Sequence, residues 1–341
     1  MQCKYITTLE DLRSFCIEFK NELSGINGKC QGCIRYGKCL QICKEQHVDA
    51  ALHMEPAESR FPGLFNFMKS TPALFWCIPA VLYKMTYGSF RDNLSCQFCT
   101  GETILDNFNQ IEKAFAILTD EQSKLTLINV LMYRLTMESD YILRAYSPEP
   151  QYVISPFRHL GKDEVYVDCG AFNGDSFEQY CSFNMPPKKA YLFEPDEHNR
   201  QAMENKLMQY RSHTDIIIFD KGVYKSSGVL YFVSGKEMGS HFSETKEEGG
   251  INVNVTSIDD AIDDDITFIK MDVEGLEKQA ILGAEKRILK NYPKLAICIY
   301  HSTKDLWEIP IFINDLFPDY SHFEIRHHTK LFFETVLYVY R

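Results

Sequence analysis

The sequence has no long hydrophobic run. Its best apolar stretch, residues 73–83, has eleven residues and is interrupted by Pro79, whereas a membrane-spanning helix needs about 20. The sequence also has no excess of positive charge, because 47 Asp and Glu outweigh 36 Lys and Arg and give a net charge of −11. Nucleic acids and anionic membrane surfaces bind basic faces. We therefore expect neither a nucleic acid nor a membrane as a partner.

The N-terminus has no basic segment followed by an apolar run, so no secretory signal peptide is evident. We expect a cytoplasmic protein whose twelve cysteines are mostly reduced thiols. Hydrophobic residues make up 45% of the chain, which is typical of a globular protein rather than a disordered one. The length of 341 residues is enough for about two domains.

The sequence pattern changes at residues 147–150, where Pro148 and Pro150 disfavour a continued helix. We place a domain boundary there. Residues 1–150 are predicted to form a mainly helical domain, and residues 151–341 are predicted to form an α/β domain.

Short apolar runs mark the strands of the second domain. They are continuous rather than alternating, which predicts strands buried on both faces of a parallel sheet. The five runs cover residues 164–168, 190–194, 215–219, 266–270 and 294–300. Two later runs, 323–326 and 335–340, predict an antiparallel hairpin at one edge of the sheet. The turn of this hairpin is expected to leave His327 and His328 in solvent.

A ligand of such a sheet lies at the carboxyl ends of the strands. Glycines after the first strand allow a sharp turn, and the helix that begins near Ser176 presents free N–H groups to a carboxylate. Glu194, at the end of the second strand, can accept both hydroxyls of a ribose. The predicted cofactor-binding residues are Asp168, Gly170, Asn173, Gly174, Asp175, Ser176, Glu194, Pro195, Gly222 and Val223.

The glycine spacing bears on the identity of this cofactor. A dinucleotide-binding loop has the pattern G-x-G-x-x-G around a pyrophosphate. Here the loop reads D-x-G-x-x-x-G from Asp168 to Gly174 and has no third close glycine. The pattern therefore favours S-adenosylmethionine over NAD.

These motifs resemble the FkbM family of S-adenosylmethionine-dependent methyltransferases. The resemblance rests on residues 167–176, on Phe193-Glu-Pro-Asp196 and above all on the K-x-D-x-E-G-x-E stretch from Lys270 to Glu277. It covers about residues 160–341. It implies a class I, Rossmann-like fold with a seven-stranded sheet. It also implies transfer of a methyl group, usually to a hydroxyl oxygen of a sugar, polyketide or other small metabolite.

The acceptor hydroxyl of such a reaction needs help to lose its proton. Lys270, Asp272 and Glu274 alternate along one stretch, so all three can face the same side. We expect the two carboxylates to act on the acceptor and Lys270 to orient them. The carboxylates could instead hold Mg²⁺ or only cap the following helix. His301, after the fifth strand, is a further catalytic candidate as a general base, or is structural.

Four cysteines gather in the first domain. Cys30, Cys33, Cys39 and Cys43 read C-x₂-C-x₅-C-x₃-C, and four thiolates this close can bind one zinc ion or iron–sulfur cluster. The spacing resembles an iron–sulfur cysteine block of SPASM domains over about fourteen residues. The alternative is a set of unrelated reduced thiols.

The sequence thus favours a methyltransferase acting on a small hydroxylated acceptor. A nicotinamide-dependent oxidoreductase and a non-catalytic module that binds S-adenosylmethionine or senses a metal are the alternatives. The missing third glycine argues against the first alternative, and the intact carboxylates at Asp272 and Glu274 argue against the second.

The cysteine pattern gives a first prediction, that each chain binds one metal centre. Elemental analysis of anaerobically purified protein should find iron or zinc. Protein that contains neither metal would contradict this prediction.

Overall fold

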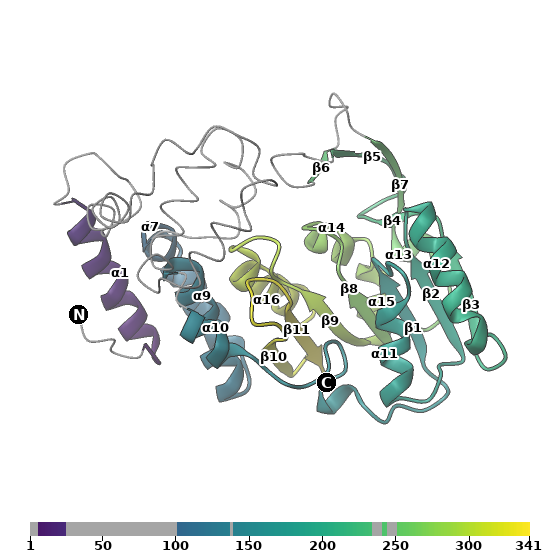
Figure 1. Cartoon of the computed structure of the whole chain (residues 1–341), viewed down its shortest axis with the longest axis horizontal. Helices are drawn as coiled ribbons and strands as arrows, with labels where there is room; N and C mark the ends of the chain where they lie inside the picture. Colours follow the sequence, from purple (N-terminus) through teal and green to yellow (C-terminus); the bar gives the residue numbers. More distant parts are fainter. Residues whose placement is uncertain (1–5, 25–100, 137–138, 234–240, 244–250) are drawn as a thin grey trace, which may run out of the picture.

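The structure, a computed structural model, describes residues 6–24, 101–136, 139–233, 241–243 and 251–341 (Figure 1). The four predicted metal ligands, Cys30, Cys33, Cys39 and Cys43, lie outside these residues. No helix within the described ranges is long and apolar enough to cross a membrane.

A seven-stranded sheet forms the centre of the fold (Figure 1). Its strands lie in the order β10-β11-β9-β8-β1-β2-β3. Five of them are parallel, and β11 is antiparallel to both of its neighbours. The bounds are β1 Val165–Cys169, β2 Lys189–Phe193, β3 Asp215–Phe219, β8 Phe268–Met271, β9 Lys294–Cys298, β10 His322–His327 and β11 Thr335–Tyr340. The predicted class I, Rossmann-like sheet and its terminal hairpin are confirmed.

Helices cover both faces of this sheet and one of its edges (Figure 1). The described part of the chain before residue 147 is helical, with α1 Leu9–Ser24, α7 Gly101–Asp106, α8 Phe108–Ile117, α9 Glu121–Thr136 and α10 Ser139–Ala145. The later helices are α11 Asp175–Phe183, α12 Glu197–Leu207, α13 Ile258–Ala261, α14 Glu277–Leu282, α15 Glu285–Asn291 and α16 Asp305–Leu316, with 3₁₀ turns at Ser155–Phe157 and Met208–Tyr210.

The strands bury side chains on both faces, as their continuous apolar runs predicted. Val167 belongs to one core, together with Trp307 of α16. Tyr166, the residue before it, belongs to the opposite core, together with Phe177 of α11. This alternation decides which side chains can meet above each face.

A second sheet was not predicted from the sequence. It has four strands in the order β4-β7-β5-β6. Their bounds are β4 Gly222–Val223, β5 Gly228–Val233, β6 His241–Ser243 and β7 Ile251–Thr256. The predicted cofactor residues Gly222 and Val223 therefore lie in a short strand paired with β7, and not in an open loop.

Helix α9 covers the outer edge of β10. The Ile325 N–H donates to the Ser123 hydroxyl at 2.8 Å, and the Phe323 N–H donates to the Thr119 hydroxyl at 3.2 Å. The Thr119 N–H and hydroxyl both donate to the Phe323 carbonyl at 3.0 Å. Thr119 and Ser123, at the start of α9, thus make the hydrogen bonds with β10 that another strand would make.

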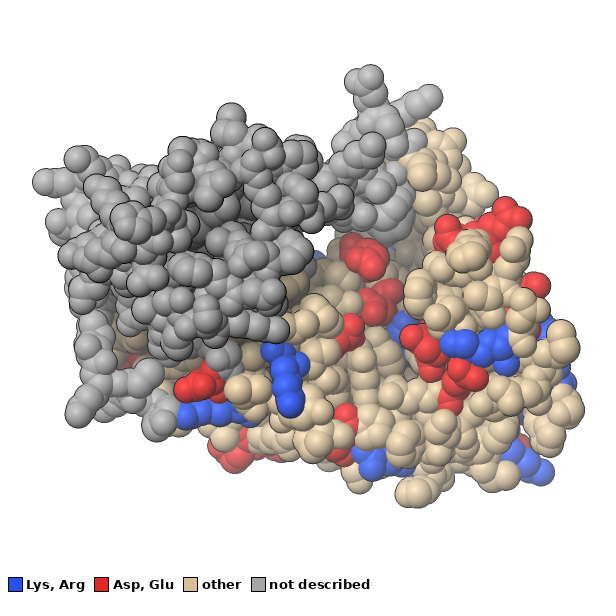
Figure 2. Space-filling view, in the orientation of Figure 1, with Lys and Arg blue, Asp and Glu red and all other residues tan. Residues whose placement is uncertain are grey.

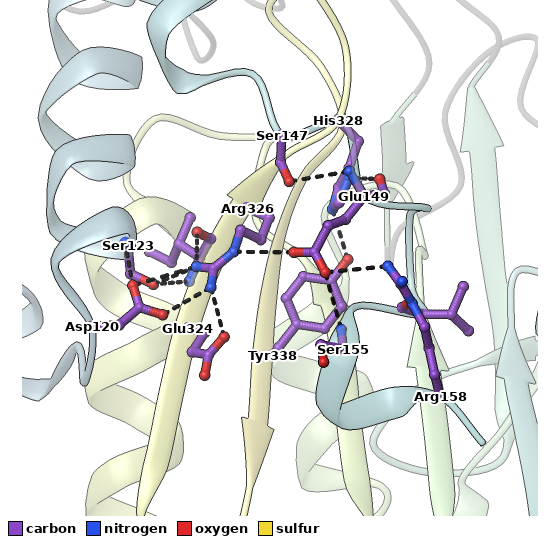
Figure 3. Close-up of polar contacts among 12 residues, drawn as sticks. Asp120, Ser123, Ser147, Glu149, Ser155, Arg158, Glu324, Arg326, His328 and Tyr338 are labelled. Atoms are coloured by element: carbon purple, nitrogen blue, oxygen red, sulfur yellow. Dashed lines mark hydrogen bonds and ion pairs between the residues drawn. The ribbon is translucent and has the colours of Figure 1, made fainter. Parts of the chain in front are cut away.

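A buried arginine fastens this helix to the sheet (Figure 3). Arg326 of β10 is 6% exposed. Its Nη2 lies 2.8 Å from carboxylate oxygens of both Asp120 and Glu324, and its Nη1 donates to the Ser123 hydroxyl at 2.8 Å. Its Nε lies 3.7 Å from Glu149 Oε2. The guanidinium therefore joins the start of α9, β10 and the segment after α10.

The expectation that His327 and His328 are solvated was wrong. His327 is the last residue of β10 and is fully buried. Its Nδ1 lies 2.8 Å from the Thr335 hydroxyl and its Nε2 lies 2.7 Å from the Leu331 carbonyl. Burial lowers the pKa of His327 to about 4. Strand β10 extends one residue beyond the apolar run at 323–326, and the residues that connect β10 to β11 fold back over His327.

Replacing Arg326 by Ala should strongly destabilise the protein, because Asp120 and Glu324 would lose the positive charge that they share. The loss expected for a broken buried pair is about 3–5 kcal/mol in the free energy of unfolding. Arg341→Ala, which breaks an exposed pair with Asp319, should cost about 1 kcal/mol or less. Urea unfolding of the native protein and the two variants measures both values. Equal losses would contradict the role of Arg326 in holding α9 to the sheet.

Candidate active site

A cavity of about 930 Å³ opens at the carboxyl ends of β1, β2 and β8. In the sheet, β2 and β3 lie on one side of β1, and β8 and β9 lie on the other. The strand order therefore reverses at β1, and open α/β sheets bind their ligands at such a point. Figure 2 shows acidic side chains in the recess at the centre of this face. The position and the exposed carboxylates make this cavity the candidate site.

Gly170 allows two strand ends to approach each other closely. Its φ is +86°, and a Cβ at this position would lie 1.9 Å from the Asp272 carbonyl oxygen. Its N–H donates to the Phe193 carbonyl at 3.1 Å. Only glycine fits here, so the loop after β1 turns directly beneath the end of β8.

Glu194 lies at the wall of the cavity beyond β2 and is 7% exposed. One carboxylate oxygen accepts the Phe172 N–H at 3.0 Å, and the other accepts the Asp196 N–H at 2.8 Å. Burial raises the pKa of Glu194, although these hydrogen bonds oppose the shift. The carboxylate is therefore held in place by the backbone. Oε1 also accepts the Asn199 amide at 3.4 Å, whereas Oε2 keeps a lone pair for a further donor.

Lys270 and Asp168 form a buried ion pair between β8 and β1. The Nζ–Oδ1 distance is 3.0 Å, and the side chains are 4% and 0% exposed. Lys270 also donates to the Gly170 carbonyl at 2.7 Å. Asp168 Oδ2 accepts the hydroxyls of Tyr166 and Ser176. Asp168 therefore fixes Lys270 and the start of α11 from below, while Lys270 itself faces the cavity.

Asp272 follows β8 and has a tyrosine on each carboxylate oxygen. The Tyr152 hydroxyl donates to Oδ2 at 3.2 Å, and the Tyr300 hydroxyl donates to Oδ1 at 3.2 Å. Burial and the charge of Asp272 raise the pKa of both phenols well above the ordinary value, so they stay protonated donors. Asp272 is thus a fixed carboxylate at the floor of the cavity.

His301 lies behind Asp272, among three carboxylates. Its Nδ1 is 3.0 Å from Glu277 Oε1, and its Nε2 is 3.4 Å from Asp272 Oδ1 and 3.6 Å from Glu274 Oε2. Burial disfavours the charged ring, but Glu277, Asp272 and Glu274 outweigh it and raise the pKa of His301 to about 10. At neutral pH His301 is an imidazolium, and it has no lone pair with which to accept a proton.

The structure brings most of the predicted site residues to one cavity. Those that line it are Gly170, Asp175, Ser176, Glu194, Pro195, Gly222, Val223, Lys270, Asp272 and Glu274. Asp168 lies beneath it, and the Asn173 amide oxygen accepts Lys206 Nζ at 2.9 Å. Gly174 is the N-cap of α11, with a φ of +82°. Lys270, Asp272 and Glu274 were expected to alternate along one extended stretch. The extended stretch is shorter than that, because β8 ends at Met271 and Glu274 has a φ of +55°.

Sequence reasoning missed Gln151, Tyr152, Phe172 and Glu334, which also line the cavity. Three of these, with Glu274, are four of the six non-glycine residues with positive φ in the part of the chain that the structure describes. Such backbone strain gathers at functional sites. No sequence signal marks φ at these positions, although Phe172 lies within residues 167–176, which carry part of the family resemblance.

Comparison with known proteins identifies this region. Residues 168–329 match the family model of the methyltransferase FkbM domain. This part of the chain is therefore similar to the FkbM methyltransferases. The family match therefore includes Asp168, Glu194 and Asp272, whereas Tyr152 and Glu334 lie outside it.

Solved structures are also similar to this chain. A methyltransferase FkbM from Methylobacillus flagellatus KT is 31% identical, with a TM-score of 0.58, and the match covers 70% of this chain and 60% of that one. The chain thus spans less than two thirds of that relative. An rRNA methylase from Streptococcus thermophilus is 14% identical with a TM-score of 0.34, over 60% of this chain and 93% of that one. No curated protein matches the sequence.

The close approach at Gly170 gives a prediction. Gly170→Ala should lower the free energy of unfolding by about 2 kcal/mol or more, because the new Cβ overlaps the Asp272 carbonyl and the backbone is left-handed. Gly161→Ala is the control, since nothing lies within 4 Å of a Cβ there. Denaturant unfolding compares the two, and a Gly170→Ala protein as stable as the control would contradict the close approach of the two strand ends.

Proposed function

We propose that this protein is an S-adenosylmethionine-dependent methyltransferase that methylates a hydroxyl oxygen of a small metabolite. The observation that carries the proposal is the cavity itself. One end presents the backbone-held carboxylate of Glu194, and the other presents Asp272 and Glu274, with Gly170 between them. A nucleoside-binding group and a proton-accepting group thus share one space of about 930 Å³.

The residues present fit the cofactor. Glu194 would accept the two ribose hydroxyls, one on the remaining lone pair of Oε2 and one on Oε1 in place of the long contact with Asn199. Asp175 and Ser176 begin α11 and line the cavity, and the carboxylate of the cofactor would take the place of the Asp175 side chain, which accepts the Ser176 N–H at 2.8 Å. When bound, S-adenosylmethionine supplies an electrophilic methyl group on a positively charged sulfur.

Asp272 is the proposed proton acceptor. In the transfer, the acceptor oxygen forms a bond to the methyl carbon as the carbon–sulfur bond breaks, and the hydroxyl proton passes to a carboxylate. The Asp272 carboxylate lines the cavity and is held by the hydroxyls of Tyr152 and Tyr300. His301, already protonated, would stabilise this charge and not act as a base. Lys270, paired with Asp168, would hold the loop and leave the proton transfer to Asp272.

Metals remain proposals at two places. Mg²⁺ bound by Asp272 and Glu274 is the alternative means of polarising the acceptor hydroxyl. Asp272, Glu277 and His301 also place donor atoms within 4.8 Å of one another. The cysteines at positions 30, 33, 39 and 43 are proposed to hold zinc or an iron–sulfur cluster, on the basis of their spacing alone.

Glu194→Ala should weaken binding of S-adenosylmethionine. Two charge-assisted hydrogen bonds to the ribose would be lost, which costs about 1.5–3 kcal/mol, or roughly ten- to a hundred-fold in affinity. Glu197→Ala, an exposed change on the neighbouring helix, should leave the affinity unchanged. Calorimetry measures both. Because burial raises the pKa of Glu194, the native affinity should also fall on mild acidification.

Calorimetric titrations with S-adenosylmethionine and NAD, together with methyl-transfer assays, separate the methyltransferase from the alternative functions. Binding of NAD in place of S-adenosylmethionine would favour an oxidoreductase. Binding of S-adenosylmethionine without methyl transfer to any of a panel of hydroxylated sugars and polyketides would favour a non-catalytic module. Transfer that survives a chelator would assign proton removal to Asp272 without Mg²⁺.

A further inference from the structure

Residues 147–158, here called the strap, follow α10 and pack along one face of the sheet, where Phe157 contacts Phe268 and Tyr338. The carboxylate and the carbonyl of Glu149 hold the strap near its start (Figure 3). Glu149 Oε1 accepts the Ser155 N–H at 3.1 Å and lies 3.2 Å from Arg158 Nη2. The Glu149 carbonyl contacts His328 Nδ1 at 3.0 Å. The strap lies outside the family match, yet it carries Tyr152 to the cavity.

The contacts of His328 fix the direction of a hydrogen-bond chain. Burial lowers the pKa of His328 to about 4, so the ring is neutral. A carbonyl can only accept, so Nδ1 carries the proton and donates to Glu149. Nε2 is then a bare acceptor, and the Tyr338 hydroxyl, 2.7 Å away, must donate to it. The Tyr338 oxygen in turn accepts the Tyr152 N–H at 2.9 Å.

This chain ends at a strained residue. Tyr152 has a φ of +65°, a conformation that costs an ordinary residue free energy and persists only where its surroundings impose it. Its side chain is equally constrained. The hydroxyl donates to Asp272, and Lys270 Nζ lies 5.2 Å from the ring centroid, over its face. Tyr152 thus contacts both functional side chains that β8 presents to the cavity.

We propose that Tyr152 is a positioning residue for Asp272, held in place by the relay from His328 through Tyr338. This role rests on the proposed methyl transfer, in which Asp272 accepts the proton. The relay fixes the backbone at Tyr152, and the phenol then fixes one carboxylate oxygen of Asp272. Tyr300 fixes the other oxygen. The carboxylate can therefore keep a single orientation toward the acceptor oxygen while the methyl group is transferred.

Tyr338→Phe tests the relay, and Tyr340→Phe is the matched control. Tyr340 lies on the same strand, but its hydroxyl donates to Glu324 and not toward the cavity. Nitrogen NMR of His328 in the unchanged protein should show a protonated Nδ1 and a bare Nε2. In crystal structures, the Tyr152 hydroxyl should leave hydrogen-bond distance of Asp272 in Tyr338→Phe and stay there in Tyr340→Phe.

Kinetics test the positioning itself, with an acceptor identified from the panel. Tyr338→Phe and Tyr152→Phe should each lower kcat by about ten- to a hundred-fold, as for a lost hydrogen bond to a charged group. The KM for S-adenosylmethionine should stay unchanged in both. Because loss of folded protein would also lower the apparent kcat at constant KM, kcat is calculated per folded enzyme, with the folded fraction taken from denaturant unfolding.

Other results would overturn the proposal. A protonated Nε2 on His328, or a Tyr152 hydroxyl that stays on Asp272 in Tyr338→Phe, would rule out the relay. An unchanged kcat in Tyr152→Phe would rule out the positioning role. The NMR and crystallographic results do not depend on methyl transfer, and calorimetry with S-adenosylmethionine tests the proposed function separately. Failure of the function and failure of the relay are therefore distinguishable.

Discussion

The buried ion pair between Lys270 and Asp168 is the interaction on which the site depends. Burial disfavours a charged amine, but Asp168 and Asp272 outweigh that effect and raise the pKa of Lys270. The pair ties β8 to β1 at the point where the sheet changes direction. Removing either partner would leave a buried charge alone. Through the same amine, the Gly170 loop, the ring of Tyr152 and the wall that carries Asp272 are held together.

Alternation along the strands explains why these groups meet. Asp168 and Lys270 lie directly opposite each other in the register of β1 and β8 and therefore point to the same face. Cys298 of β9 and Tyr338 of β11 belong to the core on that face, together with Tyr152. The opposite face is packed by α16 and other helices, and Phe193, Val223 and Val273 of its core also line the cavity. The ion pair and its tyrosine partners are thus on one side of the sheet, on strands whose order the chain topology fixes.

Sequence reasoning found the parts of this design that depend on local pattern. The continuous apolar runs predicted the parallel strands, and the glycine and acidic positions after β1, β2 and β8 were placed at the cavity. It could not find Tyr152 or Glu334, because a strap and a hairpin bring them there from beyond the matched domain. It misjudged His327, since burial there comes from residues that fold back. It also missed the second sheet, in which β4 and β6 have only two and three residues.

The contacts between α9 and β10 have a consequence for where the protein could be divided. Ser123 and Thr119 occupy the outward N–H groups of β10, and Arg326 secures the helix that carries Ser123. A chain that began at residue 151 would present β10 as a bare edge, with a row of donors and acceptors open to another molecule. Such edges pair with one another. The helices before the strap thus protect the sheet from self-association, whatever else they do.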